Sequence, residues 1–218
     1  MRMEILKLTL LALFLFITSC KPKEPKGKTL EEILSDASCN PPCWMEMIPG
    51  VTTIEGARQQ LAAHSNVIDQ DSIFDYVPTE AYLAKIGWQA KDSEIEGTLY
   101  YKTELLDHIY IRASEGKMNL ADGIELYGIP EKVMFELSQC KIKFGDSLCV
   151  SVTLHYPEKG LQLSYEQREG DSGKLVIDPN QQIYLVLFFD PRVGWDIDNN
   201  QIMDWPGYGV IDIQVQNE

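Results

Sequence analysis

The sequence predicts an α+β fold in which short helices pack on antiparallel sheet, arranged as two tandem helix-plus-sheet units. Short segments with the apolar spacing of a helix precede groups of strand-like runs rich in Tyr, Ile and Val. Residues 119–124 also parallel residues 52–57, because each segment has a capping residue, an acid three positions later, a glycine and an apolar residue. We therefore expect one unit over residues 29–116 and a second over residues 117–218.

The first twenty residues have the pattern of a secretory signal, with a basic start, an apolar run over residues 8–17 and small residues before Cys20. The apolar run is about half the length that a membrane-spanning helix needs. Residues 17–20, Ile-Thr-Ser-Cys, resemble the lipobox of bacterial lipoproteins. This resemblance implies that residues 1–20 are a signal peptide and that acyl chains such as palmitate on Cys20 form a lipid anchor. The alternatives are an ordinary secretory signal that ends in Cys and a buried apolar segment.

Residues 21–28, KPKEPKGK, are charged and contain two prolines, which predicts an extended tether between the anchor and the folded body. Lys21 stands where an Asp would resemble the inner-membrane retention signal of bacteria with two membranes. We therefore expect an extracytoplasmic protein on the outer membrane of such a cell, or on the outer face of the cell membrane where there is only one.

The chain is acidic, with a formal net charge of −14. Removing residues 1–20 takes away Arg2, Lys7 and Glu4, so the remaining chain carries a net charge near −15. This balance argues against a nucleic-acid partner and against electrostatic adhesion to anionic lipid, since both require basic patches. The charge either serves solubility or forms an acidic docking surface for a basic partner.

Four cysteines remain beside Cys20, and an even number in an exported chain predicts disulfides. Of the three possible pairings we expect Cys39–Cys43 and Cys140–Cys149, because each pair is local and each encloses turn residues. A zinc site would require tighter cysteine spacing or nearby histidines. We therefore expect no metal ion and no cofactor.

Helix-capping patterns predict where the helices of both units begin and end. Thr29 and Glu32 form a capping box before a short helix, and Thr52 with Glu55 forms a second before a helix that reaches about residue 64. In the second unit, the helix that starts near residue 119 stops at Gly128. Strand-like runs cover residues 86–90, 96–102, 108–113, 132–137, 148–156, 161–165 and 183–189.

Two of the strand predictions are specific. Residues 183–189, IYLVLFF, contain no charge and predict a central strand buried on both faces. Residues 210–215 alternate between apolar and polar side chains, which predicts an edge strand at the end of the second unit.

Residues 39–61 start with Cys-Asn-Pro-Pro-Cys-Trp and continue through Pro-Gly-Val-Thr into a helix. This head resembles a group of bacterial lipoproteins to which we can assign no activity, and the Gly-Ile-Pro of residues 128–130 matches their second helix end. The Gly-x-Thr turn is more remotely similar to the small lipoprotein of the outer-membrane β-barrel assembly machinery. That protein shares its fold with the β-lactamase inhibitor protein, which contains two such units. The resemblance implies a binding module, although residues 63–65 depart from the Leu-Gly-x-Pro helix end.

These features predict a binding or scaffold module at the membrane surface, held by its lipid anchor and contacting an envelope protein. Trp195, Trp205 and Tyr208, close to the predicted edge strand, are candidate binding residues, although such aromatics also fit core or turn positions. An envelope hydrolase with paired carboxylates is an alternative, but no hydrolase motif is present and we assign no catalytic residue. A second alternative is an ion or small-ligand sensor, based on the acidic stretch 196–200.

Overall fold

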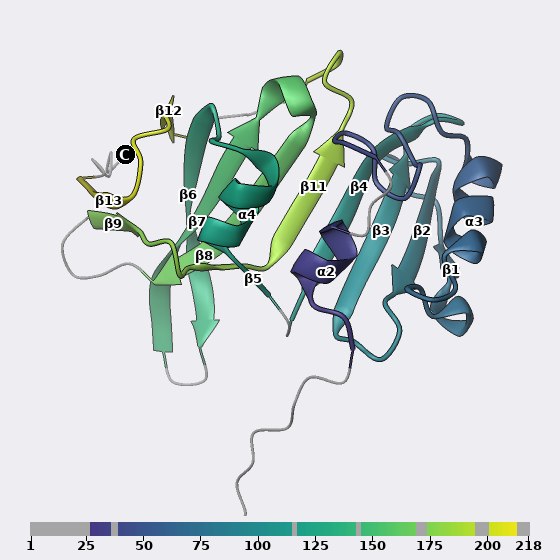
Figure 1. Cartoon of the computed structure of the whole chain (residues 1–218), viewed down its shortest axis with the longest axis horizontal. Helices are drawn as coiled ribbons and strands as arrows, with labels where there is room; N and C mark the ends of the chain where they lie inside the picture. The colour runs from purple at the N-terminus through teal and green to yellow at the C-terminus, as the bar shows by residue number, and fades with distance from the viewer. Residues whose placement is uncertain are drawn as a thin grey trace, which may run out of the picture.

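Strands dominate the structure, and its helices are few and short (Figure 1). The computed structural model describes residues 27–35, 39–114, 117–142, 145–168, 174–194 and 201–212. The helices are α2 (Leu30–Ser35), α3 (Ile54–Ala63) and α4 (Leu120–Tyr127), with 3₁₀ turns η1 (Gln70–Ser72) and η2 (Pro157–Lys159). None of the helices in this described part is long and apolar enough to cross a membrane.

Nine of the strands form one antiparallel sheet in the order β1-β2-β3-β4-β11-β8-β7-β6-β12, and β5–β10 and β9–β13 form two small sheets. The predicted α+β class with antiparallel sheet is thus confirmed, with β structure predominating. The strands are β1 (Phe74–Tyr76), β2 (Ala84–Gln89), β3 (Ile95–Tyr101), β4 (Leu106–Ala113), β5 (Met118–Asn119), β6 (Lys132–Ile142), β7 (Gly145–Tyr156), β8 (Leu161–Arg168), β9 (Lys174–Ile177), β10 (Gln182–Ile183), β11 (Leu185–Phe189), β12 (Gln201–Asp204) and β13 (Gly209–Asp212).

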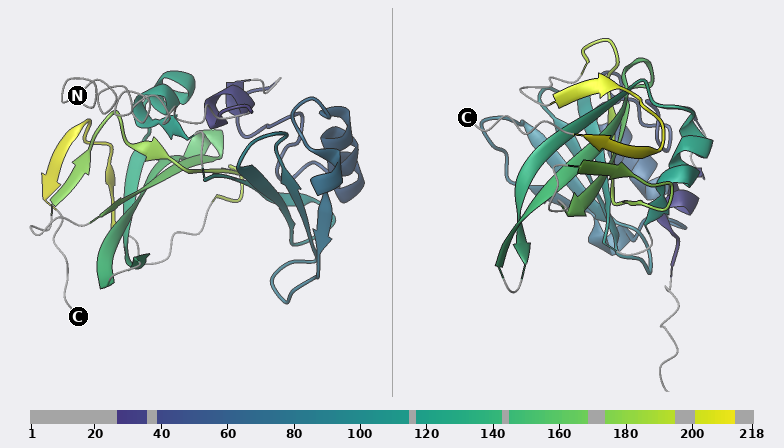
Figure 2. Two further views of the ribbon diagram at one scale, coloured as in Figure 1. Left: turned by 90° about the horizontal axis from the view of Figure 1, so that it is seen from below. Right: turned by 90° about the vertical axis from the view of Figure 1, so that its left-hand side faces the viewer.

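The three helices of the described residues lie on one side of the arched large sheet (Figure 2). Side chains alternate between the two sides of a strand, and along β3 Ile95 and Leu99 are buried whereas Glu96 is exposed. Arg58 of α3 forms an ion pair with Asp75 of β1 on the helix side. The other side, which we call the open face, carries none of the described helices.

The Cys–Trp head packs into the core on the helix side. Cys39 and Cys43 form the predicted disulfide, with their Cα atoms 5.6 Å apart. The buried indole of Trp44 stacks on that of Trp88 in β2, with ring centroids 4.9 Å apart. The partner of Trp88 across the ladder is Gly97, and a Cβ atom at Gly97 would overlap the indole. The stack therefore requires a glycine at this position of β3.

The first capping box and the end of α4 are confirmed. The backbone N–H of Thr29 donates to Glu32 Oε2 at 2.7 Å, and that of Glu32 donates to Thr29 Oγ1 at 3.3 Å. Helix α4 ends at Gly128, which adopts a φ of 82°. Asn119 precedes α4, but its side-chain amide donates to Asp122 Oδ2 at 2.9 Å and makes no cap to the backbone.

The predicted capping box of Thr52 and Glu55 is wrong by one residue. Thr53 caps α3, and its Oγ1 accepts from the backbone N–H of Gly56 at 3.1 Å. The hydroxyl of Thr52 instead accepts from the backbone N–H of Ile48 at 2.8 Å, inside the preceding turn. The hydroxyl of Thr52, which the sequence pattern assigned to the helix cap, therefore stabilises the preceding turn.

Each predicted strand run contains a strand. Of the uncharged run, residues 185–189 form β11, which is the fifth of the nine strands, and Val186 to Phe189 are buried as predicted, whereas Ile183 belongs to β10 in a separate small sheet. At the C-terminal end, β13 forms a strand that pairs with β9 and not with the large sheet, while residues 213–215 lie outside the described residues. The short strands β1, β5, β9 and β12 were not predicted.

Replacing Gly97 with alanine is expected to lower the free energy of unfolding by about 1–3 kcal/mol, because the new methyl group displaces the indole of Trp88. Urea denaturation followed by tryptophan fluorescence measures this change. Thr98→Ala, one residue along β3 on the open face, is the matched control and should change the value by less than about 1 kcal/mol. Equal midpoints for Gly97→Ala and the wild type would contradict the described packing.

Candidate binding site

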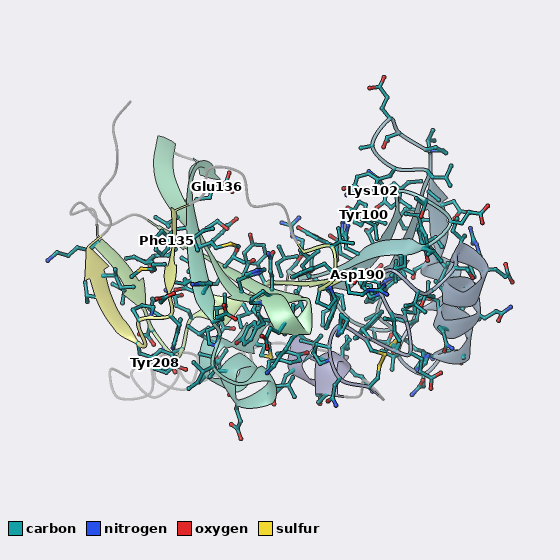
Figure 3. The ribbon with its side chains drawn as sticks, turned by 90° about the horizontal axis from the view of Figure 1, so that it is seen from above. Tyr100, Lys102, Phe135, Glu136, Asp190 and Tyr208 are labelled. Atoms are coloured by element: carbon teal, nitrogen blue, oxygen red, sulfur yellow. A yellow bond between two sulfur atoms is a disulfide. The ribbon has the colours of Figure 1, made fainter. Side chains whose placement is uncertain are left out.

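The residues predicted to bind a partner do not come together in one site. Trp205 and Tyr208 follow β12, with their ring centroids 5.9 Å apart. Trp205 packs partly buried against the core, and Tyr208 is exposed. Figure 3 places Tyr208 near one end of the molecule and Tyr100 in the other half. Trp195 and the lipidation residue Cys20 lie outside the described residues.

Of the two cysteines in the second predicted disulfide, the structure describes the side chain of one. Cys149 in β7 is disulfide-bonded. The side chain of Cys140 lies outside the described part of the structure, so its pairing with Cys149 stays a prediction.

A different group of aromatic side chains gathers on the open face. The ladder register places Lys85, Tyr100 and His108 in one row across β2, β3 and β4. The ring of Tyr100 stacks on the imidazole of His108 with centroids 4.3 Å apart, and it lies 5.0 Å from the ring of Tyr82. We call this group, which consists of Phe74, Tyr76, Tyr82, Tyr100 and Tyr110, the tyrosine patch.

The tyrosine patch is accessible and carries positive charge. Phe74 and Tyr76, on the edge strand β1, are 49% and 45% exposed. The ammonium group of Lys85 lies 4.8 Å from the ring centroid of Tyr82 and 5.2 Å from that of Tyr100, which is the distance range of cation–π contacts. Burial, followed by the neighbouring tyrosines, raises the pKa of Tyr100, so its hydroxyl stays protonated at neutral pH.

Two buried histidines lie on the open face beside the patch. Burial lowers the pKa of His108, and this outweighs its hydrogen bond to Asp107 Oδ2, 2.8 Å from its Nδ1. Burial likewise lowers the pKa of His155, which stacks on Phe189 with ring centroids 5.6 Å apart. Both imidazoles are therefore neutral near pH 7.

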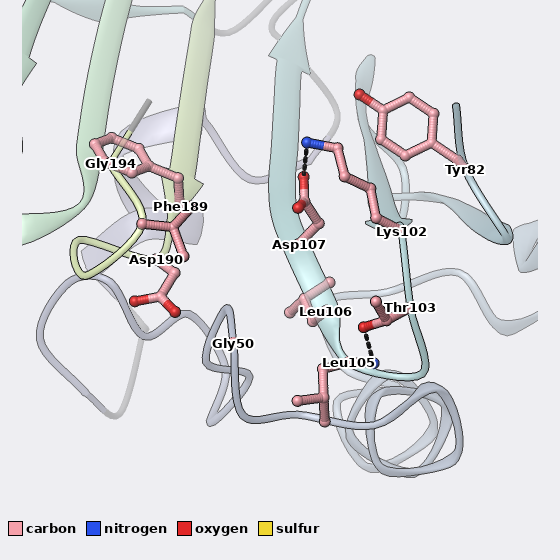
Figure 4. Close-up of a pocket in the computed structure, with 11 residues that line it drawn as sticks. Gly50, Tyr82, Lys102, Thr103, Leu105, Leu106, Asp107, Phe189, Asp190 and Gly194 are labelled. Carbon is pink, nitrogen blue, oxygen red and sulfur yellow. Dashed lines mark hydrogen bonds and ion pairs between the residues drawn. The ribbon is translucent and has the colours of Figure 1, made fainter. Parts of the chain in front are cut away.

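A pocket of about 690 Å³ adjoins the tyrosine patch at one end of the β4–β11 pair (Figure 4). Lys102 and Asp107 stand on one side of it, and Phe189 and Asp190 stand on the other. Tyr82 belongs to both the patch and the pocket wall. The pocket is also lined by Gly50, Thr103, Leu105, Leu106 and Gly194.

The two carboxylates of the pocket are both ion-paired. Burial raises the pKa of Asp107, but His108 and Lys102 outweigh it and lower the pKa overall. Hydrogen bonds from Arg192 lower the pKa of Asp190. A carboxyl group that acts as a general acid needs a raised pKa, which neither group has. Within the described ranges, no three His, Cys, Asp or Glu side chains are arranged to hold a metal ion.

The sequence predicted Tyr100 and Tyr110 of the patch only as strand-forming residues, and it gave no role to Tyr76 or Tyr82. Strict alternation places Tyr100 on the same side as Thr98, and Tyr110 on the same side as His108, so each strand alone shows which residues share a face. The signal that was missing is the order of the strands, which brings β1 to β4 side by side.

Lowering the pH from about 7.5 to about 5 is expected to destabilise the protein through His108 and His155. Since the folded state lowers both pKa values below the ordinary 6.5, the unfolded chain takes up these protons first as the pH falls. Stability is therefore full above pH 6.5 and is lost below it, by at most about 1.4 kcal/mol per pH unit for each histidine. Urea unfolding at several pH values measures the slope. His108→Gln should reduce it, and an unchanged slope would argue against the assignment.

No protein-family model matches the sequence, and neither a curated protein nor a solved structure matches it.

Proposed function

We propose that the protein is a membrane-anchored, extracytoplasmic binding or scaffold module whose partner, an envelope protein, contacts the open face. The observation that supports this most directly is the tyrosine patch on the helix-free side of the sheet. Tyrosine supplies a large apolar ring, a polar hydroxyl and little conformational freedom, and it is enriched where protein interfaces concentrate their binding energy. A rigid antiparallel sheet holds the rings in place before a partner arrives.

The arrangement of elements supports two tandem units within this module. Helix α3 is followed by the meander β2-β3-β4, and α4 is followed by the meander β6-β7-β8. The two meanders meet at β11, which pairs with β4 on one side and β8 on the other. The proposed boundary between residues 116 and 117 falls between β4 and β5.

The proposed anchor rests on the sequence of residues 1–28. Cys20 ends a signal-like segment, and the charged tether leads to Gly27, where the described structure starts. The capped helix α2 follows directly, so the folded body begins close behind the lipid.

A hydrolase remains the second candidate because Asp107 and Asp190 line one pocket. Both pKa values are lowered, so this pair lacks the protonated carboxyl that glycoside hydrolysis needs. The ion sensor depends on residues 196–200, which lie outside the described residues. The geometry therefore favours binding over catalysis.

Mass spectrometry of the protein from its native host tests the anchor. We expect a mature chain that starts at Cys20 and carries two or three acyl chains, and Cys20→Ser should release the protein from the membrane. An unmodified terminus, or one that retains residues 1–19, would contradict the proposed location.

Site-specific photocrosslinking in native envelopes tests the binding face. The photoreactive residue is placed at Tyr76 on the open face, which is 45% exposed, and at Leu126 on α4 as a matched control, which is 39% exposed. We expect a discrete crosslinked protein with Tyr76 and none with Leu126. Absence of product at both positions, or the same product at both, would count against an open-face partner.

A further inference from the structure

We propose that the pocket beside the tyrosine patch binds a neutral saccharide. This site goes beyond the protein partner proposed above, and it does not depend on the lipid anchor. All of its walls are described. Tyr82 precedes β2, Lys102 follows β3 and Asp107 lies in β4, while Phe189 ends β11 and Asp190 follows it (Figure 4).

The size of the pocket suits a small ligand. At about 690 Å³ it falls inside the range of sites that hold small molecules. It lies where the turn at Gly50 meets the two central strands, because the backbone N–H of Gly50 donates to Leu106 O at 2.6 Å. Segments that are distant in sequence therefore hold the walls of the pocket.

The charges in the pocket are already balanced. Lys102 Nζ lies 3.3 Å from Asp107 Oδ2, and Asp190 accepts two hydrogen bonds of 2.8 Å from the guanidinium group of Arg192. Each of these charges already has a counter-ion, and both cations are solvent-exposed, so an added anion or cation meets little net charge in the pocket and gains little Coulomb energy. A neutral polar ligand leaves both pairs intact.

The polar groups that remain are complementary to hydroxyl groups. A carboxylate has about four acceptor positions, and an ammonium has three donors, so Asp107 and Lys102 can each bind a further group while paired. Thr103 Oγ1 accepts from the backbone N–H of Leu105 at 3.2 Å and keeps its own proton to donate. A sugar hydroxyl can donate to the carboxylate and accept from the ammonium at the same time.

The remaining walls are apolar and fit the C–H face of a sugar ring. The half-buried ring of Tyr82 stands on the patch side with the Lys102 ammonium 5.9 Å from its centroid. Leu105 is 40% exposed at the rim and supplies apolar surface, whereas Phe189, which is 1% exposed, only backs the opposite wall. Specific sites for small ligands combine such apolar walls with a few well-placed polar groups.

Titration of the full chain followed by backbone amide NMR tests the site. The probes are neutral di- and trisaccharides of glucose, galactose, mannose and N-acetylglucosamine, with inorganic phosphate and acetate as charged comparisons. We expect at least one saccharide to bind with a Kd of about 1 mM or tighter and to shift the amides of Lys102, Thr103 and Asp190. Phosphate and acetate should shift them far less.

Three variants make this result specific. Tyr82→Ala and Thr103→Val, which remove an apolar and a polar contact, should each weaken binding about tenfold. Leu126→Ala, an exposed apolar residue of α4 on the other side of the sheet, should leave binding unchanged. The proposal is overturned if no saccharide saturates the site, if phosphate or acetate binds there more tightly, or if both pocket variants bind like the wild type. Unchanged near-ultraviolet circular dichroism excludes misfolding of the variants.

Discussion

The large sheet depends on the pairing of β11 with two strands at once. Each of the five residues of this strand is in register with β4, from Leu185 opposite Arg112 to Phe189 opposite His108, and four of them are also in register with β8. The buried backbone of such a strand must have partners on both edges, because an unpaired N–H or C=O away from water is costly. The β4–β11 and β11–β8 ladders therefore join the two meanders in one continuous sheet. The side chains of β11 pack on both sides of the sheet, because Val186 and Phe188 face the helices and Phe189 faces the open side.

The candidate sites follow from this junction. The turn at Gly50 binds β4 through Leu106, and the guanidinium group of Arg192 reaches the carbonyl of Gly50 at 3.4 Å. Phe189 also donates its backbone N–H to Gly160 O at 2.8 Å. Three segments that are distant in sequence are thus fixed around one pocket. The tyrosine patch lies next to it because β1 to β4 extend the sheet on that side.

Local patterns predicted local structure well and long-range structure poorly. The uncharged run of β11 and the Thr29–Glu32 box depend on neighbouring residues alone, and both are confirmed. The cap of α3 shifted to Thr53 because Thr52 finds a partner in the preceding turn, which the helix pattern does not include. The tyrosine patch and the pocket were missed for a stronger reason. They exist only once the strand order is known, and no residue spacing within one strand contains that order.

The position of β11 also determines the order in which the protein can fold during synthesis. The first meander is complete at Ala113, yet the strand that covers its edge begins at Leu185, after the whole second meander. Until β11 is in place, β4 and β8 each present an unpaired edge, which is the feature through which sheet proteins aggregate. Contacts so distant in sequence also form slowly. A chain truncated before Leu185 would therefore lack the strand that joins the two meanders, and both halves would be incomplete.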